Sequence, residues 1–300
     1  MSLSSAMFTG VSGLQSNSQA ISVIGNNIAN SNTVGFKSSS TLFSDLLYQN
    51  IGNNSQVGTG EKVQLVRTNY TGGSMANSTS VTDVAIQGNS FFALAAPGAT
   101  AAVNQNAAYL TRAGEFNVDT AYHLVNPDGY EAVQANGGTP ILFQHNTPPA
   151  AVVAGDYAKV TAIDSRGVIT YQDLQGNSFY YNGNGAAGLP VSTANYNTVL
   201  TAGNVIAVVN PTNPNGLAKI GNNLYQSTGA SGVPAAAFTA AANTANGTSE
   251  TMLSNYLESS NVDMATELVN MLTTQRAYSA NSKTITTADQ MIQETLGLVR

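Results

Sequence analysis

The chain has no cysteine and no tryptophan, and only 9% of its 300 residues are charged, against roughly 25% in typical globular proteins. Because cysteine is absent, neither a disulfide framework nor a thiolate metal site is possible. Any stability outside the cell therefore comes from side-chain packing or from assembly. Serine, threonine, asparagine, glutamine and glycine supply the polarity that charged residues usually provide.

Long hydrophobic runs and basic clusters are also missing. No apolar segment approaches the roughly 18 residues that a membrane-spanning helix needs, so we expect no membrane insertion. Residues 1–36 contain neither a charged side chain nor a continuous apolar stretch, so we predict export without a cleaved signal peptide, by another route. The net charge of −6 leaves no basic stripe for a phosphate backbone, so we expect no nucleic-acid partner.

The residues that usually carry catalysis are few and poorly spaced. The two histidines, His123 and His145, are far apart and have no neighbouring cysteine, so no metal site is predicted. The segment Gly58-Thr59-Gly60-Glu61-Lys62 lacks the spacing of a phosphate-binding loop. Asp164 and Asp173 could be considered as a glycosidase pair, but both lie in turn-like contexts where acids commonly form local hydrogen bonds. We therefore predict no enzymatic activity, no catalytic residue and no cofactor.

A heptad pattern is present at both ends of the chain when residues are taken at alternating steps of four and three. One interpretation is that each stripe is the core face of a helix packed on the middle of the chain. The same pattern at both termini favours a coiled coil between the two terminal helices. The predicted seam, for which we expect a role in self-assembly, consists of Leu3, Met7, Leu14, Ile21, Ile24, Ile28, Met264, Leu268, Met271, Tyr278, Ile285, Ile292, Leu296 and Val299.

Two local features bear on these helices. Ser260-Asn261-Val262-Asp263 has the form of a capping motif, so the second helix is expected to start close to Asn261. Gly10, Gly13 and Gly25 are each expected to weaken the first helix by about 1 kcal/mol. We therefore expect the helix pair to need the same pair in neighbouring copies as a partner.

The hydrophobic period changes between the two ends. Residues 81–94 and 109–130 are rich in Val, Ile, Phe and Tyr and are interrupted by turn residues, which indicates antiparallel strands. Residues 50–60 and 228–248 are rich in Gly, Asn, Ala and Ser without clear periodicity, which predicts flexible connections. Further short strands are expected at 140–143, 157–163, 167–171, 178–181 and 205–209.

These patterns predict an α+β fold with paired N- and C-terminal coiled-coil helices and a central, mostly β domain. Residues 1–32 with 258–300 form the expected terminal helical domain, and residues 33–75 with 228–257 form a linker region. Residues 76–227 form the β-rich outer domain, in which 131–204 are expected to be either a small insertion or only loops.

The segment from Gly25 to Lys37, GNNIANSNTVGFK, closely resembles the N-terminal motif of bacterial flagellar rod and hook proteins. Further stretches agree with the same family in the same order, at 46–49, 83–92, 109–116, 215–225, 260–271 and 275–283. Residues 131–204 carry no matching motif. The residues that carry the N-terminal motif are Asn26, Asn27, Asn30, Thr33, Gly35, Phe36 and Lys37.

The resemblance implies an axial structural subunit whose terminal helices form an inner tube and whose β domain forms an outer layer. It also implies export through the flagellar type III apparatus, location in the hook or basal body, and assembly into a helical homo-polymer. The implied neighbours are rod, hook-cap and hook–filament junction proteins.

Within this family, residues 279–291 and 1–7 are most similar to the hook protein, here in a short form. The chain is therefore interpreted as a hook subunit that assembles into a flexible hollow tube and transmits motor torque to the filament. The alternative is a distal rod subunit. The resemblance implies two domains for a rod protein, whereas many hook proteins carry an additional outer β domain.

Overall fold

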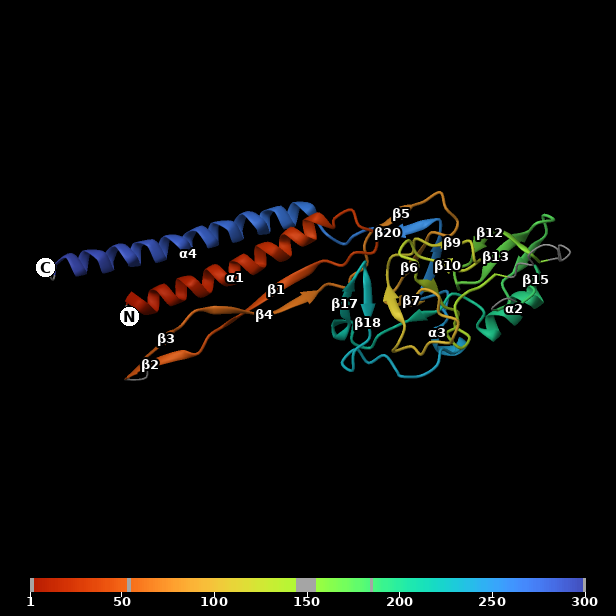
Figure 1. Cartoon of the computed structure of the whole chain (residues 1–300), viewed down its shortest axis with the longest axis horizontal. Helices are drawn as coiled ribbons and strands as arrows, with labels where there is room; N and C mark the ends of the chain where they lie inside the picture. The colour runs from red at the N-terminus through yellow and green to blue at the C-terminus, as the bar shows by residue number, and fades with distance from the viewer. Residues whose placement is uncertain (1–2, 53–54, 144–154, 184–185, 299–300) are drawn as a thin grey trace. The chain divides into compact units, whose positions relative to one another are not determined.

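The computed structural model describes residues 3–52, 55–143, 155–183 and 186–298 (Figure 1). Of the predicted residues, His145 and Val299 lie outside these ranges. The chain divides into two compact units. Unit 1 comprises residues 1–32, 37–69 and 261–300, and unit 2 comprises residues 33–36 and 70–260. The mixture of helices and sheets confirms the α+β class.

Unit 1 consists of two long helices and two two-stranded antiparallel sheets. Its elements are α1 (Leu3–Ala29), β1 (Ser39–Asp45), β2 (Tyr48–Gly52), β3 (Ser55–Gly58), β4 (Glu61–Thr68) and α4 (Met264–Leu298). Strand β1 pairs antiparallel with β4, and β2 pairs antiparallel with β3. The residues of β1 and β4 are exposed or half-buried throughout, so no apolar alternation reveals these strands. The structure therefore has strands in a segment where a linker was predicted.

Helix α4 begins at Met264, three residues after the predicted start at Asn261. The Asp263 carboxylate accepts hydrogen bonds from the backbone N–H groups of Ala265, at 2.9 Å, and Thr266, at 3.3 Å. Asp263 is thus itself the N-cap residue, a role that its carboxylate suits. Hydrogen bonds from the backbone and hydroxyl of Thr266, and then from Ala265, hold the pKa of Asp263 below its usual range.

Unit 2 is built around one large antiparallel sheet. Its strands follow the order β17-β18-β8-β7-β11-β10-β9, and β16 also pairs with β7. These strands are β7 (Phe91–Ala95), β8 (Tyr109–Thr111), β9 (Asn117–Val118), β10 (Leu124–Val125), β11 (Glu131–Ala132), β16 (Val208–Val209), β17 (Ala218–Gly221) and β18 (Leu224–Gln226).

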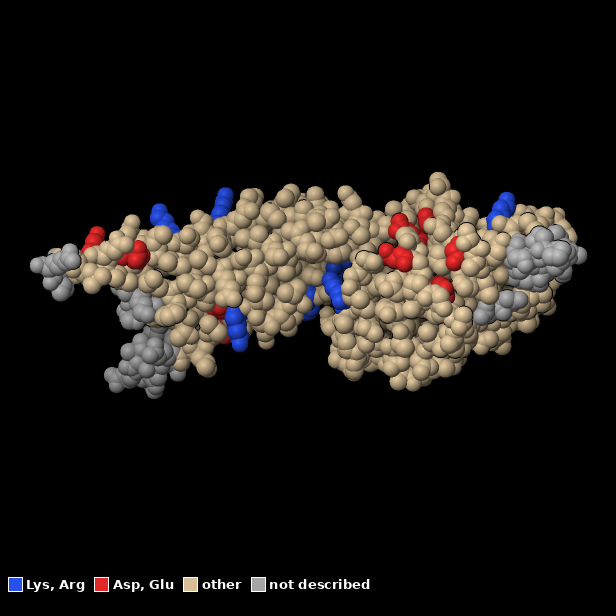
Figure 2. All heavy atoms as spheres, in the orientation of Figure 1, with Lys and Arg blue, Asp and Glu red and all other residues tan. Residues whose placement is uncertain are grey.

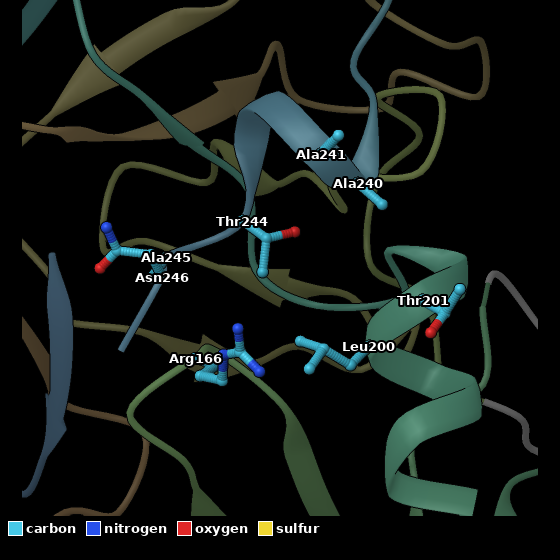
Figure 3. A pocket seen from close by; sticks show the side chains of 8 residues that line it. All are labelled: Arg166, Leu200, Thr201, Ala240, Ala241, Thr244, Ala245 and Asn246. Atoms are coloured by element: carbon cyan, nitrogen blue, oxygen red, sulfur yellow. The ribbon is translucent and has the colours of Figure 1, made fainter. Parts of the chain in front are cut away.

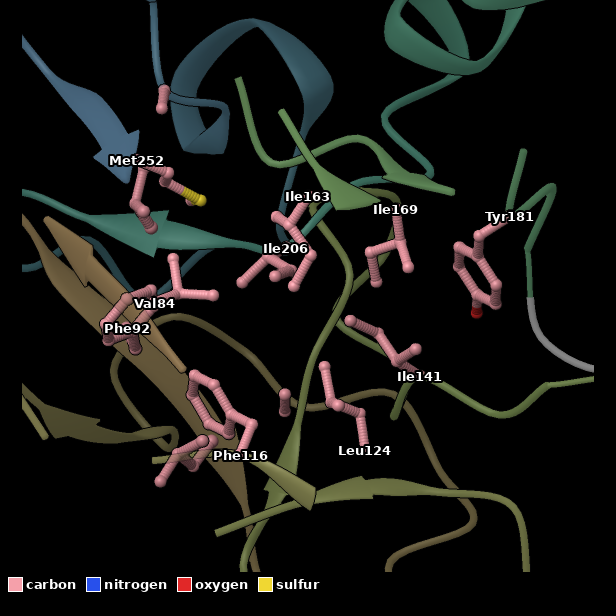
Figure 4. Close-up of a cluster of buried hydrophobic side chains, with 14 of the residues drawn as sticks. Val84, Phe92, Phe116, Leu124, Ile141, Ile163, Ile169, Tyr181, Ile206 and Met252 are labelled. Carbon is pink, nitrogen blue, oxygen red and sulfur yellow. The ribbon is translucent and has the colours of Figure 1, made fainter. Parts of the chain in front are cut away.

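Strand β7 is buried on both faces of this sheet. Because successive side chains of a strand point to opposite faces, Phe92 and Leu94 enter one hydrophobic cluster, while Phe91, Ala93 and Ala95 enter another. Figure 4 shows Phe92 in the first cluster, together with Phe116, Leu124 and Ile206. The core of unit 2 therefore has two layers that share β7.

The remaining elements of unit 2 surround this sheet. They are β5 (Met75–Asn77), β6 (Val84–Gln87), β12 (Tyr157–Ile163), β13 (Ile169–Asp173), β14 (Ser178–Tyr180), β15 (Leu189–Pro190), α2 (Thr193–Ala202), a 3-10 turn at Pro214–Gly216, α3 (Ala240–Asn243), β19 (Thr251–Ser254) and β20 (Tyr256–Glu258). Strands β12 to β15 form a four-stranded sheet, β19 pairs with β6, and β20 pairs with β5.

The unmatched stretch 131–204 contributes to the same core as the rest of unit 2. Ile169 and Tyr181 lie in the first cluster, and Val168 and Val199 lie in the second. Helix α2 was not predicted, although Ser192 caps its start and Gly203, at φ 77°, ends it in the left-handed conformation. In the sequence, these two capping residues were the signal from which the helix could have been predicted.

Residues 228–248, predicted to be a flexible connection, are packed within unit 2. Asn243 is buried and donates a hydrogen bond to the carbonyl of Val208 at 3.1 Å, and it accepts one from the N–H of Thr239 at 3.0 Å. Phe238 and Ala245 are buried too. Such nonlocal contacts produce no hydrophobic period, which is why the sequence did not reveal them.

The chain passes between the units four times, after residues 32, 36, 69 and 260. On unit 1, the side chain of Asn261 joins the passages: it accepts from Ser38 N–H at 2.8 Å and donates to the carbonyl of Asn69 at 2.9 Å. On unit 2, Glu258 joins the passages of the chain in the same way. Its carbonyl accepts from Gly35 N–H at 2.7 Å, and its carboxylate accepts from Gly73 N–H at 2.9 Å.

The Glu258 carboxylate also forms a buried ion pair with Arg112, whose Nη1 lies 3.3 Å from Oε2. The guanidinium donates further hydrogen bonds to the carbonyls of Ile86, at 3.3 Å, and Gly88, at 2.6 Å, and lies 5.0 Å from the ring centroid of Phe91. Burial lowers the pKa of Arg112 and the Glu258 charge opposes this shift. Arginine nevertheless stays charged, so the pair is ionic.

We expect Glu258→Gln to lower the free energy of unfolding of unit 2 by about 3 to 5 kcal/mol, because the Arg112 charge would remain buried without its counter-charge. Urea unfolding followed by tyrosine fluorescence measures this, since the chain has no tryptophan. The control Asp128→Asn, at an exposed turn, is expected to change stability by less than about 0.5 kcal/mol. Equal stability of Glu258→Gln and the unsubstituted chain would contradict the importance of the ion pair.

Candidate functional site

Helices α1 and α4 run antiparallel and lie side by side within unit 1 (Figure 1). Gly10 faces Ile285 and Asn281, and the side-chain amide of Asn27 donates to Glu267 Oε1 at 3.0 Å. The buried residues of α1 are Gly10, Gly13, Ser16, Ala20, Ile24 and Asn27. The less exposed residues of α4 include Glu267, Met271, Thr274, Asn281, Ile285, Ala288 and Ile292.

The two glycines near the start of α1 allow this close approach. A Cβ atom on Gly10 would lie 2.8 Å from Ile285 Cγ1, and one on Gly13 would lie 2.3 Å from Asn281 Nδ2. Gly25, by contrast, has nothing within 4 Å of that position. Gly10 and Gly13, which the sequence indicated only as weak points of the helix, therefore occupy the contact with α4.

The predicted seam does not coincide with this contact line. On α1 only Ile24 of the predicted residues is buried, and Met7, Leu14, Ile21 and Ile28 are half-buried; the side chain of Leu3 is not among those described. On α4, Met271, Ile285 and Ile292 are half-buried, whereas Met264, Leu268, Tyr278 and Leu296 are 42% to 65% exposed. The paired heptad seams of a coiled coil are thus not confirmed.

The four half-buried residues Met7, Leu14, Ile21 and Ile28 form one flank of α1. Since each residue turns the helix by about 100°, this flank lies about 75° from the line that faces α4. On α4, Leu268 and Leu296 lie to the corresponding side of its own contact line. Because the helices are antiparallel, both flanks are on the same side of the pair. We call these six residues the open face.

The hairpin of β1 and β4 packs against α1 on the other side. The Ser16 hydroxyl donates to the carbonyl of Glu61 at 3.4 Å, and the Ser12 hydroxyl accepts from Glu61 N–H at 3.4 Å. A Cβ on Gly60 would lie 2.1 Å from Ser12 Oγ, so only glycine fits there. The helix pair is therefore covered on one side and left partly exposed on the other.

Few charges are available for contacts across these surfaces. Figure 2 shows that Lys, Arg, Asp and Glu occupy little of the visible face of the molecule. In the described part of the chain, no helix has a stretch both long and apolar enough to cross a membrane.

The asparagines of the N-terminal motif form the end of α1. The Asn27 amide accepts from Ser39 N–H at 2.9 Å and donates to the carbonyl of Ser39 at 2.8 Å, while also reaching Glu267. Asn30 Nδ2 donates to the carbonyl of Asn26 at 2.9 Å. Asn27, which is buried, therefore holds α1, β1 and α4 together, and Asn30 with Asn26 closes the helix.

The second half of the motif makes a turn in unit 2. The carbonyl of Thr33 accepts from Phe36 N–H at 3.3 Å. Gly35 has φ 68°, and a Cβ there would lie 2.5 Å from the backbone nitrogen of Ala113, so no side chain fits. Phe36 is buried with Lys219 Nζ 5.6 Å from its ring centroid.

Lys37, the last motif residue, is buried and returns the chain to unit 1. The motif thus spans two of the four passages of the chain between the units. Its residues are constrained by hydrogen bonds and close backbone packing, which are structural requirements.

The acids considered for catalysis have structural roles. Burial would raise the pKa of Asp173, but hydrogen bonds from Asn177, Gly155 and Gln175 outweigh it and hold that pKa below its usual range. Asp164 accepts a hydrogen bond from the Tyr196 hydroxyl. Asp173 therefore stabilises the turn between β13 and β14.

His123 likewise has a local partner. Its Nδ1 lies 3.2 Å from Glu131 Oε1, which also accepts from Gly98 N–H at 3.0 Å. Among the described residues, no group of three or more His, Asp or Glu side chains could hold a metal ion. Within the segment from Gly58 to Lys62, Gly58 ends β3, Thr59 and Gly60 connect the strands, and Glu61 begins β4.

Comparisons with known families match three separate parts of the chain. Residues 7–37 match the flagella basal body rod protein family. Residues 85–171 match the flagellar hook protein FlgE/F/G D1 domain, and residues 253–298 match the C-terminal part of the flagellar basal body rod FlgEFG proteins. The matches include most of α1, all of α4 and part of the large sheet of unit 2.

Individual relatives extend this similarity to almost the whole chain. The flagellar basal-body rod protein FlgG of Bacillus subtilis (strain 168) is 31% identical over 98% of this chain and 99% of its own length. The FlgG of Buchnera aphidicola subsp. Schizaphis graminum (strain Sg) is 35% identical over 94% and 95%. The flagellar hook protein FlgE of Borreliella burgdorferi is 38% identical over 41% of this chain and 28% of its own length.

The similarity at both helical ends confirms the resemblance found from the N-terminal motif. It also covers unit 2, including the stretch without recognised motifs. From this similarity and the shared domains, the chain belongs to the family of flagellar rod and hook proteins.

Proposed function

We propose that the chain is a structural subunit of the distal rod of the bacterial flagellar basal body. The observation that carries this proposal is how much of each relative's length aligns with this chain. Proteins named FlgG align along nearly their whole length, whereas the hook protein aligns over 28% of its own. The comparisons therefore favour the rod over the hook, which was the leading interpretation of the sequence.

The division into two units supports the same proposal. Many hook proteins carry an additional outer β domain, and residues 131–204 were expected to be either a small insertion or only loops. The described part of this stretch instead shares the two hydrophobic clusters of unit 2. Two units fit the expectation for a rod protein.

Within this proposal the open face mediates self-assembly. Its side chains are apolar, lie on one side of the helix pair and are left partly exposed within a single chain. Burying them against the helix pairs of neighbouring copies would remove apolar surface from water, which stabilises association. The seam residues would then act between copies and not between the two helices of one chain.

Export through the flagellar type III apparatus, and contacts with neighbouring rod and hook proteins, belong to this proposal. The absence of cysteine suits passage of an unfolded chain, because no disulfide has to be broken. The family is structural, so no catalytic step is proposed.

Electron microscopy of the polymerised, purified chain tests the assignment. A rod subunit is expected to form straight, rigid tubes, because a rod requires stiff contacts between copies. Curved or supercoiled tubes would instead support a hook. A chain that stays monomeric at high concentration would contradict both.

We expect Ile21→Asp to raise the concentration needed for polymerisation at least tenfold, since a charge would be placed in an apolar contact. The matched control is Gln19→Asp, an exposed position about 160° around the helix from Ile21. Sedimentation of polymer at a series of concentrations measures the effect, and circular dichroism checks that unit 2 stays folded. Similar values for both variants would exclude the open face from assembly.

Gly10→Leu is expected to weaken the polymer by separating α1 from α4, since overpacking of this kind costs about 1 to 3 kcal/mol. Gln19→Leu is the control, because Gln19 is exposed and lies on the side of α1 that is turned away from both α4 and the open face. The stability of the two variant polymers is compared by measuring the melting temperature of the assembled tubes. A Gly10→Leu polymer that melts with, or above, the control would show that the close approach is dispensable.

A further inference from the structure

A cavity of about 360 Å³ in unit 2 opens between α2, α3 and the turn after β12. Figure 3 shows where the lining residues come from: Arg166 lies in the turn, Leu200 and Thr201 at the end of α2, and the remaining residues in α3 and the segment that follows it. These remaining residues are Ala240, Ala241, Thr244, Ala245 and Asn246. The volume lies in the range of small-molecule sites.

Two polar atoms of these lining residues have no hydrogen-bond partner within the described chain. Arg166 Nε and Thr244 Oγ1 are both inaccessible to solvent, and neither forms a hydrogen bond to the described residues. A buried donor without an acceptor is costly, and such atoms are rare in folded proteins. Both residues line the cavity, so its wall contains polar groups that the described chain leaves without a partner.

The Arg166 side chain is held in place by its surroundings. A Cβ on Gly247 would lie 3.1 Å from Arg166 Cγ, so the backbone of Gly247 packs against the aliphatic part of the side chain. Gly247 has φ 73°, a conformation that glycine adopts at low cost. The guanidinium is thereby positioned in advance of binding.

The polar groups nearest to Arg166 are already engaged. The Asp164 carboxylate accepts from the Tyr196 hydroxyl, and burial followed by this hydrogen bond raises the pKa of Tyr196 to about 12, so the hydroxyl remains a donor. Asn246 Oδ1 accepts from the N–H groups of Thr248, at 2.9 Å, and of Glu250, at 3.0 Å. No ion pair of Arg166 occurs among the residues described.

We propose that this cavity binds an aliphatic carboxylate, with the terminal Nη groups of the Arg166 guanidinium as donors. A carboxylate is planar and fits the edge of a guanidinium with two parallel hydrogen bonds. Leu200, Ala240, Ala241 and Ala245 offer apolar contact to the carbon chain that follows it. A phosphate would bring further charged oxygens against these alanines without donors to receive them.

The carboxylate has two sources, a free short-chain acid or the acidic side chain of another protein. Isothermal titration of the full chain with sodium hexanoate represents the first, and titration with N-acetylglutamic acid amide represents the second. Saturable binding of either supports the site, and the tighter ligand identifies the source. Absence of binding of both at millimolar concentration would overturn the proposal, as would phosphate binding as tightly as hexanoate.

Variants locate the binding. Arg166→Gln is expected to weaken binding at least tenfold, whereas Lys159→Gln, which removes an exposed cation from β12 of the same hairpin, leaves it unchanged. Equal affinity of Arg166→Gln and the unsubstituted chain would refute the role of Arg166. A second readout avoids any loss of folding in the variant: in the ¹⁵N-labelled unsubstituted chain, the Nη–H resonances of Arg166 are expected to move downfield on saturation, and stationary resonances would overturn the proposal.

Discussion

The carboxylate and carbonyl of Glu258 connect three stretches of chain that are distant in sequence. Gly35 and Gly73 donate their N–H groups to it, and Arg112 supplies the counter-charge within a buried environment. A buried ion pair contributes little net stability over an apolar equivalent, but it is strongly destabilising when one member is lost. The ion pair therefore serves mainly to fix the positions at which the chain leaves and re-enters unit 2. Asn261 does the same for unit 1 with the neutral hydrogen bonds of an amide.

Sequence patterns predicted the features that depend on local chemistry. Both terminal helices, the α+β class and the strand at 157–163 follow from period and composition, and the motif from Asn26 to Lys37 led to the correct family. The helix contact could not be found in this way, because heptad counting rewards large apolar side chains, whereas α1 faces α4 through Gly10 and Gly13. Helix α3 depends on the distant carbonyl of Val208, which no local window contains. The Arg166 cavity was missed for the same reason, since its lining comes from three separate segments.

The apolar stripes that suggested a coiled coil are still informative, although about a different surface. A repeat of seven residues keeps its side chains on one flank of a helix, whatever lies opposite. On α1 that flank is turned away from α4, and small residues take the internal contact. One helix thus carries two interfaces with different chemistry, small side chains for its own chain and large ones for neighbouring copies under the proposed function. The hook protein aligns with 41% of this chain, whereas the FlgG of Bacillus subtilis aligns with 98% of it, so the extent of the alignment separates the two.

The pairing of α1 with α4 sets an order of events in the life of the chain. Gly10 meets Ile285, so α1 lacks its partner helix until the chain has been made as far as α4. At a synthesis rate of about 5 to 20 residues per second, this delay is on the order of tens of seconds. Unit 2 has no such requirement for α4 and can complete its core earlier. The synthesis of α4 therefore decides when α1 gains its helical partner, and a chain that lacks α4 would expose the glycines of α1.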